Sequence, residues 1–286
     1  MEQYTWTYPQ LSLTIREGMS REEEYIDIVR RGILPNTPVF PLQETGFEEA
    51  YVLDTPAGRA EVLYLPERKI FEHFVRALAH RCEPVPLPPS MGAMMISGVN
   101  NWRKIEAHKK AYHKNGGTNW AEEFRAFTAK KDNYKDVILL VSRGNYSALT
   151  AEAAGFSKEE WIKKSKTIRI YHELTHFVSR KLFPENRDIL RDEVLADSVG
   201  LFAVFGCYDA LLAKKLLGIE GQEYRSGGRL ENYVEEALLK EAAEEAKEMV
   251  KALEVFYGAN GGKSPFELLM EAEQKRIGME GESCRR

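Results

Sequence analysis

One long helix is expected near the middle of the chain, and specific side chains mark both of its ends. Ser157 and Glu160 fit a capping box, in which a hydroxyl and a carboxylate satisfy unpaired backbone N–H groups at a helix start. Pro184 sets the other end, because the residue before a proline disfavours the helical conformation. The pattern therefore predicts a helix over residues 157–183.

The interior of this helix carries two histidines one turn apart, in the sequence His-Glu-Leu-Thr-His from His172 to His176. Residues at i and i+4 share a helix face, so the two imidazoles can bind one ion. Zinc suits them, because it accepts neutral imidazole nitrogens and leaves a position for water in catalytic sites. Glu173 is turned about a quarter of the way round the helix, beside that open position. We predict one zinc ion per chain, with Glu173 as the general base that takes a proton from the bound water.

A third ligand is expected on a second helix, predicted over residues 187–205. If the two helices fold back on each other, Glu193 returns to the level of His176, since each lies about 11 Å from the turn. Glu193 and Asp197 share a helix stripe that is otherwise mostly apolar, and buried carboxylates are costly without a positive partner. We predict Glu193 as the third ligand and Asp197 as the acceptor for the ring N–H of a ligand histidine.

The alternative interpretation is a salt-bridged helix pair with ordinary core histidines. In that case the acids would pair with nearby basic residues, namely Arg180, Lys181 or Arg191. Asp192 lies beside Glu193 but off the shared stripe, so we expect it to be exposed to solvent.

Groups that could stabilise a developing oxyanion are expected downstream, in a glycine-hinged loop at residues 221–233. The alternative for this loop is a flexible surface segment. The candidate side chains are Tyr224, Arg225, Arg229 and Tyr233.

The rest of the chain predicts an α+β protein in two lobes. Residues 1–156 mix strand and helix signals: a hairpin at 51–65, a helix at 67–82 and a buried or half-buried strand at 137–141. Residues 157–286 are expected to be all helical. Beyond the two helices above, we expect helices at 208–217 and 230–257, and one that begins with Ser264 as N-cap and Pro265 at its first position.

Composition excludes several classes of protein. The formal net charge is −4, which gives no overall attraction to nucleic acid. The segment from Trp102 to Lys135 contains nine basic residues and four acidic ones. No binding motif accompanies them, so we expect a solvated helix face rather than a nucleic-acid site.

No apolar run approaches the ~20 residues of a membrane span. The N-terminus lacks a signal-peptide pattern and the 3 cysteines are too few for a disulfide framework, so we expect a cytoplasmic protein.

The His-Glu-Leu-Thr-His sequence, with Glu193 and Asp197 on the following helix, resembles the gluzincins, the thermolysin-like clan of zinc metallopeptidases. The resemblance covers about residues 168–201. It implies a zincin-like fold with the active-site helix between the two lobes. It also implies His172, His176 and Glu193 as ligands and Glu173 as base. Asp197 would contact a ligand histidine, and His172 is the expected partner.

The same resemblance implies that an edge strand, here near residues 137–141, holds an extended substrate. The expected activity is that of an intracellular metallopeptidase or related amide hydrolase acting on a peptide or another amide-containing substrate. The alternative is a regulatory or binding protein that keeps the zincin fold and its metal without turnover. The spacing from His176 to Glu193 is shorter than in thermolysin, so the connecting loop must be tight. The oligomeric state stays open.

Overall fold

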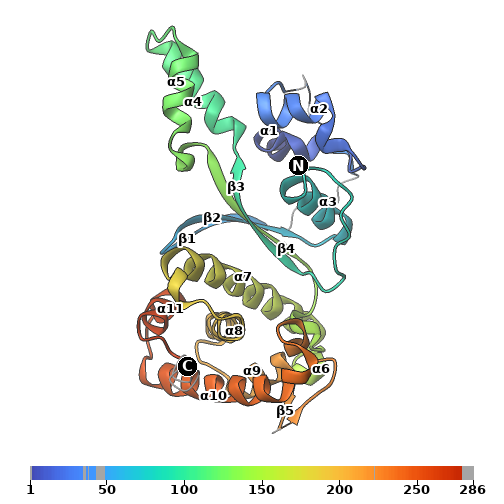
Figure 1. Cartoon of the computed structure of the whole chain (residues 1–286), viewed down its shortest axis with the longest axis vertical. Helices are drawn as coiled ribbons and strands as arrows, with labels where there is room; N and C mark the ends of the chain where they lie inside the picture. Colours follow the sequence, from blue (N-terminus) through green and yellow to red (C-terminus); the bar gives the residue numbers. More distant parts are fainter. Residues whose placement is uncertain (1, 35–36, 38, 43–48, 222, 279–286) are drawn as a thin grey trace. The chain divides into compact units, whose positions relative to one another are not determined.

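The computed structural model describes residues 2–34, 37, 39–42, 49–221 and 223–278 of this mixed α/β chain (Figure 1). It divides into two compact units: Met1–Leu53 with Arg59–Ser142, and Asp54–Gly58 with Arg143–Arg286. This division falls before the boundary predicted at residue 156. The reason is that Tyr146 and Leu149 are buried in the core of the second unit, where Trp161 Nε1 donates a 2.7 Å hydrogen bond to the Leu149 carbonyl.

A four-stranded mixed sheet organises the first unit. Its strands are β1 (Glu49–Thr55), β2 (Gly58–Leu65), β3 (Ala93–Asn100) and β4 (Lys135–Ser142), in the order β1-β2-β4-β3. The predicted hairpin is confirmed as β1 and β2. Strand β4 pairs with β2 in parallel and with β3 antiparallel, so the prediction of an edge strand at 137–141 is wrong. Four consecutive buried residues, 138–141, explain its interior position, since both faces of the strand are covered.

Helix α3 (Arg68–Ala79) packs against this sheet, and further helices and turns complete the first unit. The predicted helix at 67–82 is confirmed as α3, whose apolar face contacts β3 and β4. The basic segment forms α4 (Trp102–Lys114) and α5 (Trp120–Thr128), followed by a short turn η4 (Lys131–Asn133). The N-terminal turns are α1 (Glu2–Thr7), η1 (Pro9–Ser12), η2 (Met19–Arg21), α2 (Glu23–Tyr25) and η3 (Ile26–Arg31).

The second unit is built around one central helix. Helix α8 (Ile189–Phe205) contacts α7 (Lys158–Leu182), α9 (Ala210–Leu217), α10 (Leu239–Ala259) and α11 (Pro265–Gln274), as Figure 1 shows. The capping boxes at Ser157 and Ser264 are both present. The shorter elements are η5 (Tyr146–Ala148), α6 (Ala151–Ala154), η6 (Pro184–Asn186), β5 (Ile219–Glu220), β6 (Glu223–Tyr224), η7 (Arg229–Asn232) and η8 (Glu236–Leu238).

Two expectations for this unit need correction. The unit is not all helical, because β5 and β6 pair as a short antiparallel hairpin. The helix predicted from residue 230 begins only at Leu239, because η7 and η8 occupy the preceding residues as separate turns. No helix in the described ranges combines the length and the apolar character needed to cross a membrane.

In the first unit one tyrosine hydroxyl lies between a carboxyl group of β2 and one of β4. The Tyr8 hydroxyl lies 2.8 Å from Glu61 Oε2 and 2.6 Å from Asp136 Oδ2. One hydroxyl carries one hydrogen, so it can donate to only one of these carboxyl groups. Asp136 also accepts from Asn101 Nδ2 and Lys104 Nζ, both at 2.6 Å, which favours its ionised form. Asp136 therefore has the stronger donors of the two carboxyl groups.

The pKa of Glu61 reflects this arrangement. Burial raises the pKa of Glu61, the Tyr8 hydrogen bond opposes that change, and the charge on Asp136 raises it further. The pKa of Glu61 in the folded chain thus lies above its ordinary value.

We predict that Glu61 makes the stability of the first unit depend on pH. A carboxyl whose pKa is raised by folding stabilises the fold below its unfolded pKa of about 4.3, and that contribution is lost as pH rises through the folded pKa. The side chain introduced by Glu61→Gln is neutral at every pH, so the parent should lose unfolding free energy relative to this variant as pH rises from about 4 to 8. Urea unfolding across that range measures the difference. Glu24→Gln, at an exposed position, is the control and should track the parent. A difference between the parent and Glu61→Gln that stays constant with pH would contradict a raised pKa of Glu61 in the folded chain.

Candidate metal centre

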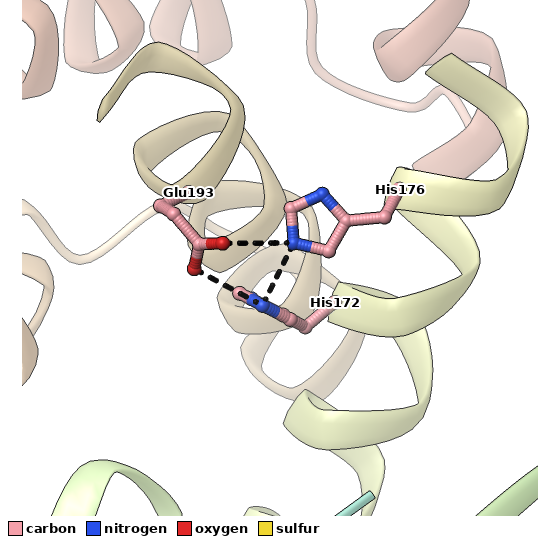
Figure 2. Close-up of side chains that lie close together, drawn as sticks. All are labelled: His172, His176 and Glu193. Carbon is pink, nitrogen blue, oxygen red and sulfur yellow. Dashed lines mark hydrogen bonds and ion pairs between the residues drawn. The ribbon is translucent and has the colours of Figure 1, made fainter. Parts of the chain in front are cut away.

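Three side chains from α7 and α8 converge on one point (Figure 2). The Nε2 atoms of His172 and His176 lie 3.1 Å apart. Glu193 Oε2 lies 3.4 Å from His172 Nε2, and Glu193 Oε1 lies 3.3 Å from His176 Nε2. The two histidines are buried, and the Glu193 side chain is only 17% exposed.

Close packing of the two helices produces this convergence. A Cβ atom at Gly200 would lie 2.7 Å from the carbonyl oxygen of Ile168, so only glycine allows α8 to approach α7 at this level. The connection between the helices is short, with η6 at Pro184–Asn186 and Asp188 accepting a hydrogen bond from the Arg191 backbone as N-cap. The predicted fold-back of the helix pair is therefore present.

The spacing of the three side chains suits one shared ion. With bonds of about 2.0–2.1 Å, two ligands of a tetrahedral zinc lie roughly 3.3–3.4 Å apart. The two Nε2 atoms lie 3.1 Å apart, and the nearest Glu193 oxygen is Oε1 for His176, at 3.3 Å, and Oε2 for His172, at 3.4 Å, so each pair of side chains is close to this spacing. The three side chains can thus hold one such ion and leave its fourth position to another ligand.

The far nitrogen of His172 is held by Asp197 and Tyr146. His172 Nδ1 lies 2.9 Å from Asp197 Oδ1 and 2.7 Å from the Tyr146 hydroxyl, which itself donates to Asp197 Oδ1 at 2.5 Å. A carboxylate can only accept, so the hydrogen of a neutral His172 lies on Nδ1. The lone pair on Nε2 then points toward His176 and Glu193, as a metal ligand requires. Asp197 lies where the sequence predicts it.

The negative charges of Glu193 and Asp197 favour a positive group between them. Burial lowers the pKa of His172, but its hydrogen bonds to Asp197 and Glu193 and their charges outweigh burial and raise it to about 9. Burial raises the pKa of Glu193, yet His172 and His176 outweigh it and hold that pKa well below the usual range. Burial also raises the pKa of Asp197, and Arg229 and His172 reverse the effect. In the absence of metal a proton on His172 therefore fills the place of a cation.

Arg229 contacts both acids of the cluster. Its Nη2 lies 3.0 Å from Asp197 Oδ1 and 3.2 Å from Glu193 Oε2. Its Nε donates to the Tyr233 hydroxyl at 2.6 Å, and that hydroxyl donates to Glu193 Oε2 at 2.8 Å. The remaining nitrogen, Nη1, lies 3.2 Å from the Tyr146 hydroxyl. One guanidinium thus links both carboxylates and both tyrosines.

Of the four predicted loop donors, Arg229 and Tyr233 reach the cluster and the other two do not. The Tyr224 ring packs against Gly228, where an added Cβ would lie 2.8 Å from it. Arg225 is exposed and pairs with Glu220 at 3.3 Å.

Glu173 and Asp192 flank the ligands. Glu173 is half-buried, and within the described part of the chain its carboxylate forms no hydrogen bond or ion pair. The prediction that Asp192 is exposed to solvent is wrong: its side chain is 14% exposed and Arg187 Nε lies 3.9 Å away. Burial raises the pKa of Asp192, and the charge of His176 lowers it in part.

The basic partners that the salt-bridge alternative requires lie elsewhere. Arg191 pairs with the buried Glu273 at 3.0 Å, and Lys181 Nζ donates to the Ala57 carbonyl at 2.8 Å. Arg180 is exposed. The counter-charge for Glu193 and Asp197 comes instead from Arg229.

Tyr146 is the residue at the cluster that sequence reasoning missed. It stands in η5, where the following Ser147 and Ala148 have φ of 55° and 56°, a conformation that costs about 1–3 kcal/mol for a residue other than glycine. A single tyrosine in a short turn has no periodic pattern around it, so the sequence contains no signal that marks it.

We predict that Tyr146→Phe destabilises the second unit by about 1.5–3 kcal/mol, because its hydroxyl bonds to charged partners. Tyr257→Phe is the matched control: among the residues that the structure describes, this buried hydroxyl bonds to the neutral Ser198 Oγ at 3.1 Å and to no charged group, so the loss should be about 0.5–1.5 kcal/mol. Urea unfolding of the metal-free proteins gives both values. An equal or smaller loss for Tyr146→Phe would show that the network contributes no charge-assisted stability.

Comparison with known proteins adds one finding. No curated protein and no solved structure matches the chain. A model of a protein family of unknown function, DUF7005, matches residues 2–257, which include every residue of the cluster. The chain therefore belongs to the DUF7005 family.

Proposed function

We propose that this chain is a zinc-dependent hydrolase of the gluzincin type, and specifically a metallopeptidase that cleaves an amide bond. The observation that carries the proposal is the convergence of His172 Nε2, His176 Nε2 and the Glu193 carboxylate, from two consecutive helices, with each pair of side chains 3.1 to 3.4 Å apart. The contact of Asp197 with the far nitrogen of His172 supports it, because ligand histidines in zinc sites commonly donate that hydrogen to a carboxylate. A zincin-like fold, with α7 as the active-site helix, is part of the same proposal.

The proposed mechanism assigns a separate task to each side chain. Bound zinc would supply Lewis acidity toward the scissile carbonyl and lower the pKa of water. Glu173, next to His172 and free of other partners in the described residues, would accept the proton of the attacking water and deliver it to the leaving amine. Asp197 and Tyr146 would keep His172 in the tautomer whose Nε2 lone pair is available.

We predict about one zinc per chain in the purified protein, measured by metal analysis. The double change His172→Ala, His176→Ala should abolish it, because Glu193 alone offers too few donors for a structural or catalytic site. His113→Ala removes an exposed histidine from α4 and should leave the zinc content unchanged. Full occupancy in the double variant would move the metal to other residues.

We predict that Glu173→Gln keeps zinc but lowers the hydrolysis rate by at least ~10²-fold, the usual scale for loss of a general base. A peptide library screened with the zinc-loaded parent would supply the substrate. Glu185→Gln, an exposed position in η6, is the control and should keep the parental rate. Unchanged turnover in Glu173→Gln would exclude the proposed mechanism. Zinc binding with no cleavage of any peptide would favour the regulatory alternative.

A further inference from the structure

We infer that Arg229 is a positioning residue that makes Glu193 bind the metal through one oxygen, Oε1, with Tyr233 as its intermediary. The inference rests on the proposed metal site. It assigns Arg229 and Tyr233 to the carboxylate ligand, rather than to a substrate oxyanion.

The contacts of Glu193 divide unequally between its two oxygens. Oε2 accepts from Tyr233 at 2.8 Å and from Arg229 Nη2 at 3.2 Å. A carboxylate oxygen has about two acceptor sites, so these two donors occupy Oε2, which also lies 3.4 Å from His172 Nε2. The contacts of Arg229 and Tyr233 with Glu193 are both to Oε2, and Oε1 faces His176 Nε2 at 3.3 Å. Its lone pairs are therefore the ones left for a metal.

Arg229 is itself fixed from several sides. Its guanidinium carbon lies 5.5 Å from the centre of the Tyr146 ring and 5.6 Å from that of Tyr233, and its side chain is 11% exposed. The backbone before it is anchored at Gly218, where a Cβ atom would lie 2.7 Å from Gly228 Cα. Gly218 has a φ of +87°, which favours glycine as well. A side chain held this rigidly can orient the acids that it contacts.

Positioning and simple electrostatics predict opposite effects of removing this arginine. A buried positive charge beside a metal ligand repels a divalent cation, so Coulomb's law alone predicts tighter binding when the charge is lost. If Arg229 instead orients Glu193 and Asp197, its loss frees both carboxylates and weakens binding. The sign of the change in zinc affinity therefore decides between the two roles.

The experiment is a competition for zinc between a chromophoric chelator and each protein variant. We expect Arg229→Gln to bind zinc about 10–100-fold more weakly than the parent, the scale seen when a ligand's supporting contacts are removed. Arg229→Lys keeps the charge but not the planar fork, so it should also weaken binding. Tyr233→Phe keeps every charge and removes one donor to Oε2, and it should weaken binding to a smaller extent. Arg180→Gln, an exposed arginine on α7, is the matched control and should bind like the parent.

A second readout separates positioning from a merely structural role. In cobalt-loaded protein, the visible absorption should change in Arg229→Gln and Tyr233→Phe, because Glu193 can then offer both oxygens, and should stay unchanged in Arg180→Gln. Thermal unfolding of the metal-free proteins checks that each variant is folded. Should Arg229→Gln fail to fold, Tyr233→Phe decides, since it removes a single hydroxyl.

The outcomes distinguish this inference from the proposed function. A parent protein that binds no zinc overturns both. A parent that binds zinc, with Arg229→Gln or Tyr233→Phe binding as tightly or more tightly, overturns only the positioning role. Weaker binding with an unchanged cobalt spectrum would overturn the one-oxygen geometry.

Discussion

The close approach of α7 and α8 is the contact on which the metal centre depends. Gly200 lies against the backbone of Ile168, and a Cβ atom there would meet the Ile168 carbonyl oxygen at 2.7 Å. Ile168 lies one turn before His172, and Asp197 lies about one turn before Gly200, so the tightest point of the helix pair is next to the cluster. Any larger residue at 200 would push the helices apart and separate the imidazoles from their acids.

Each unit contains a partly buried acid, and the two acids have different charge partners. In the first unit burial and the charge of Asp136 raise the pKa of Glu61, which favours its protonated form. In the second unit Glu193 stays ionised, because imidazoles and Arg229 surround it. A protonated acid is a poor metal ligand, whereas an ionised one beside two imidazole nitrogens is a good one. The difference in charge partners therefore separates a structural contact from a candidate metal site.

The predictable part of the fold is the part whose signals are local. Capping side chains, proline breaks and helical periodicity each act within a few residues, and they identified α7, α8 and α11 and the β1–β2 hairpin. The strand at β4 was also expected, but its place between β2 and β3 was not, because strand order depends on pairing with distant segments. The predicted start of α10 lies too early in the sequence for a similar reason. The acidic sequence before Leu239 suits a helix, but contacts of η7 with α9 and α10 hold those residues in separate turns.

For the site, the sequence by itself determined the side chains that share a helix face: His172 with His176, and Glu193 with Asp197. The fixed geometry of the α-helix is the reason, since residue spacing converts directly into direction. Only the tertiary structure decided which groups complete the cluster. Tyr146 reaches Asp197 across 51 residues of chain and Arg229 reaches it across 32, and no spacing rule relates residues that meet only because separate elements pack together.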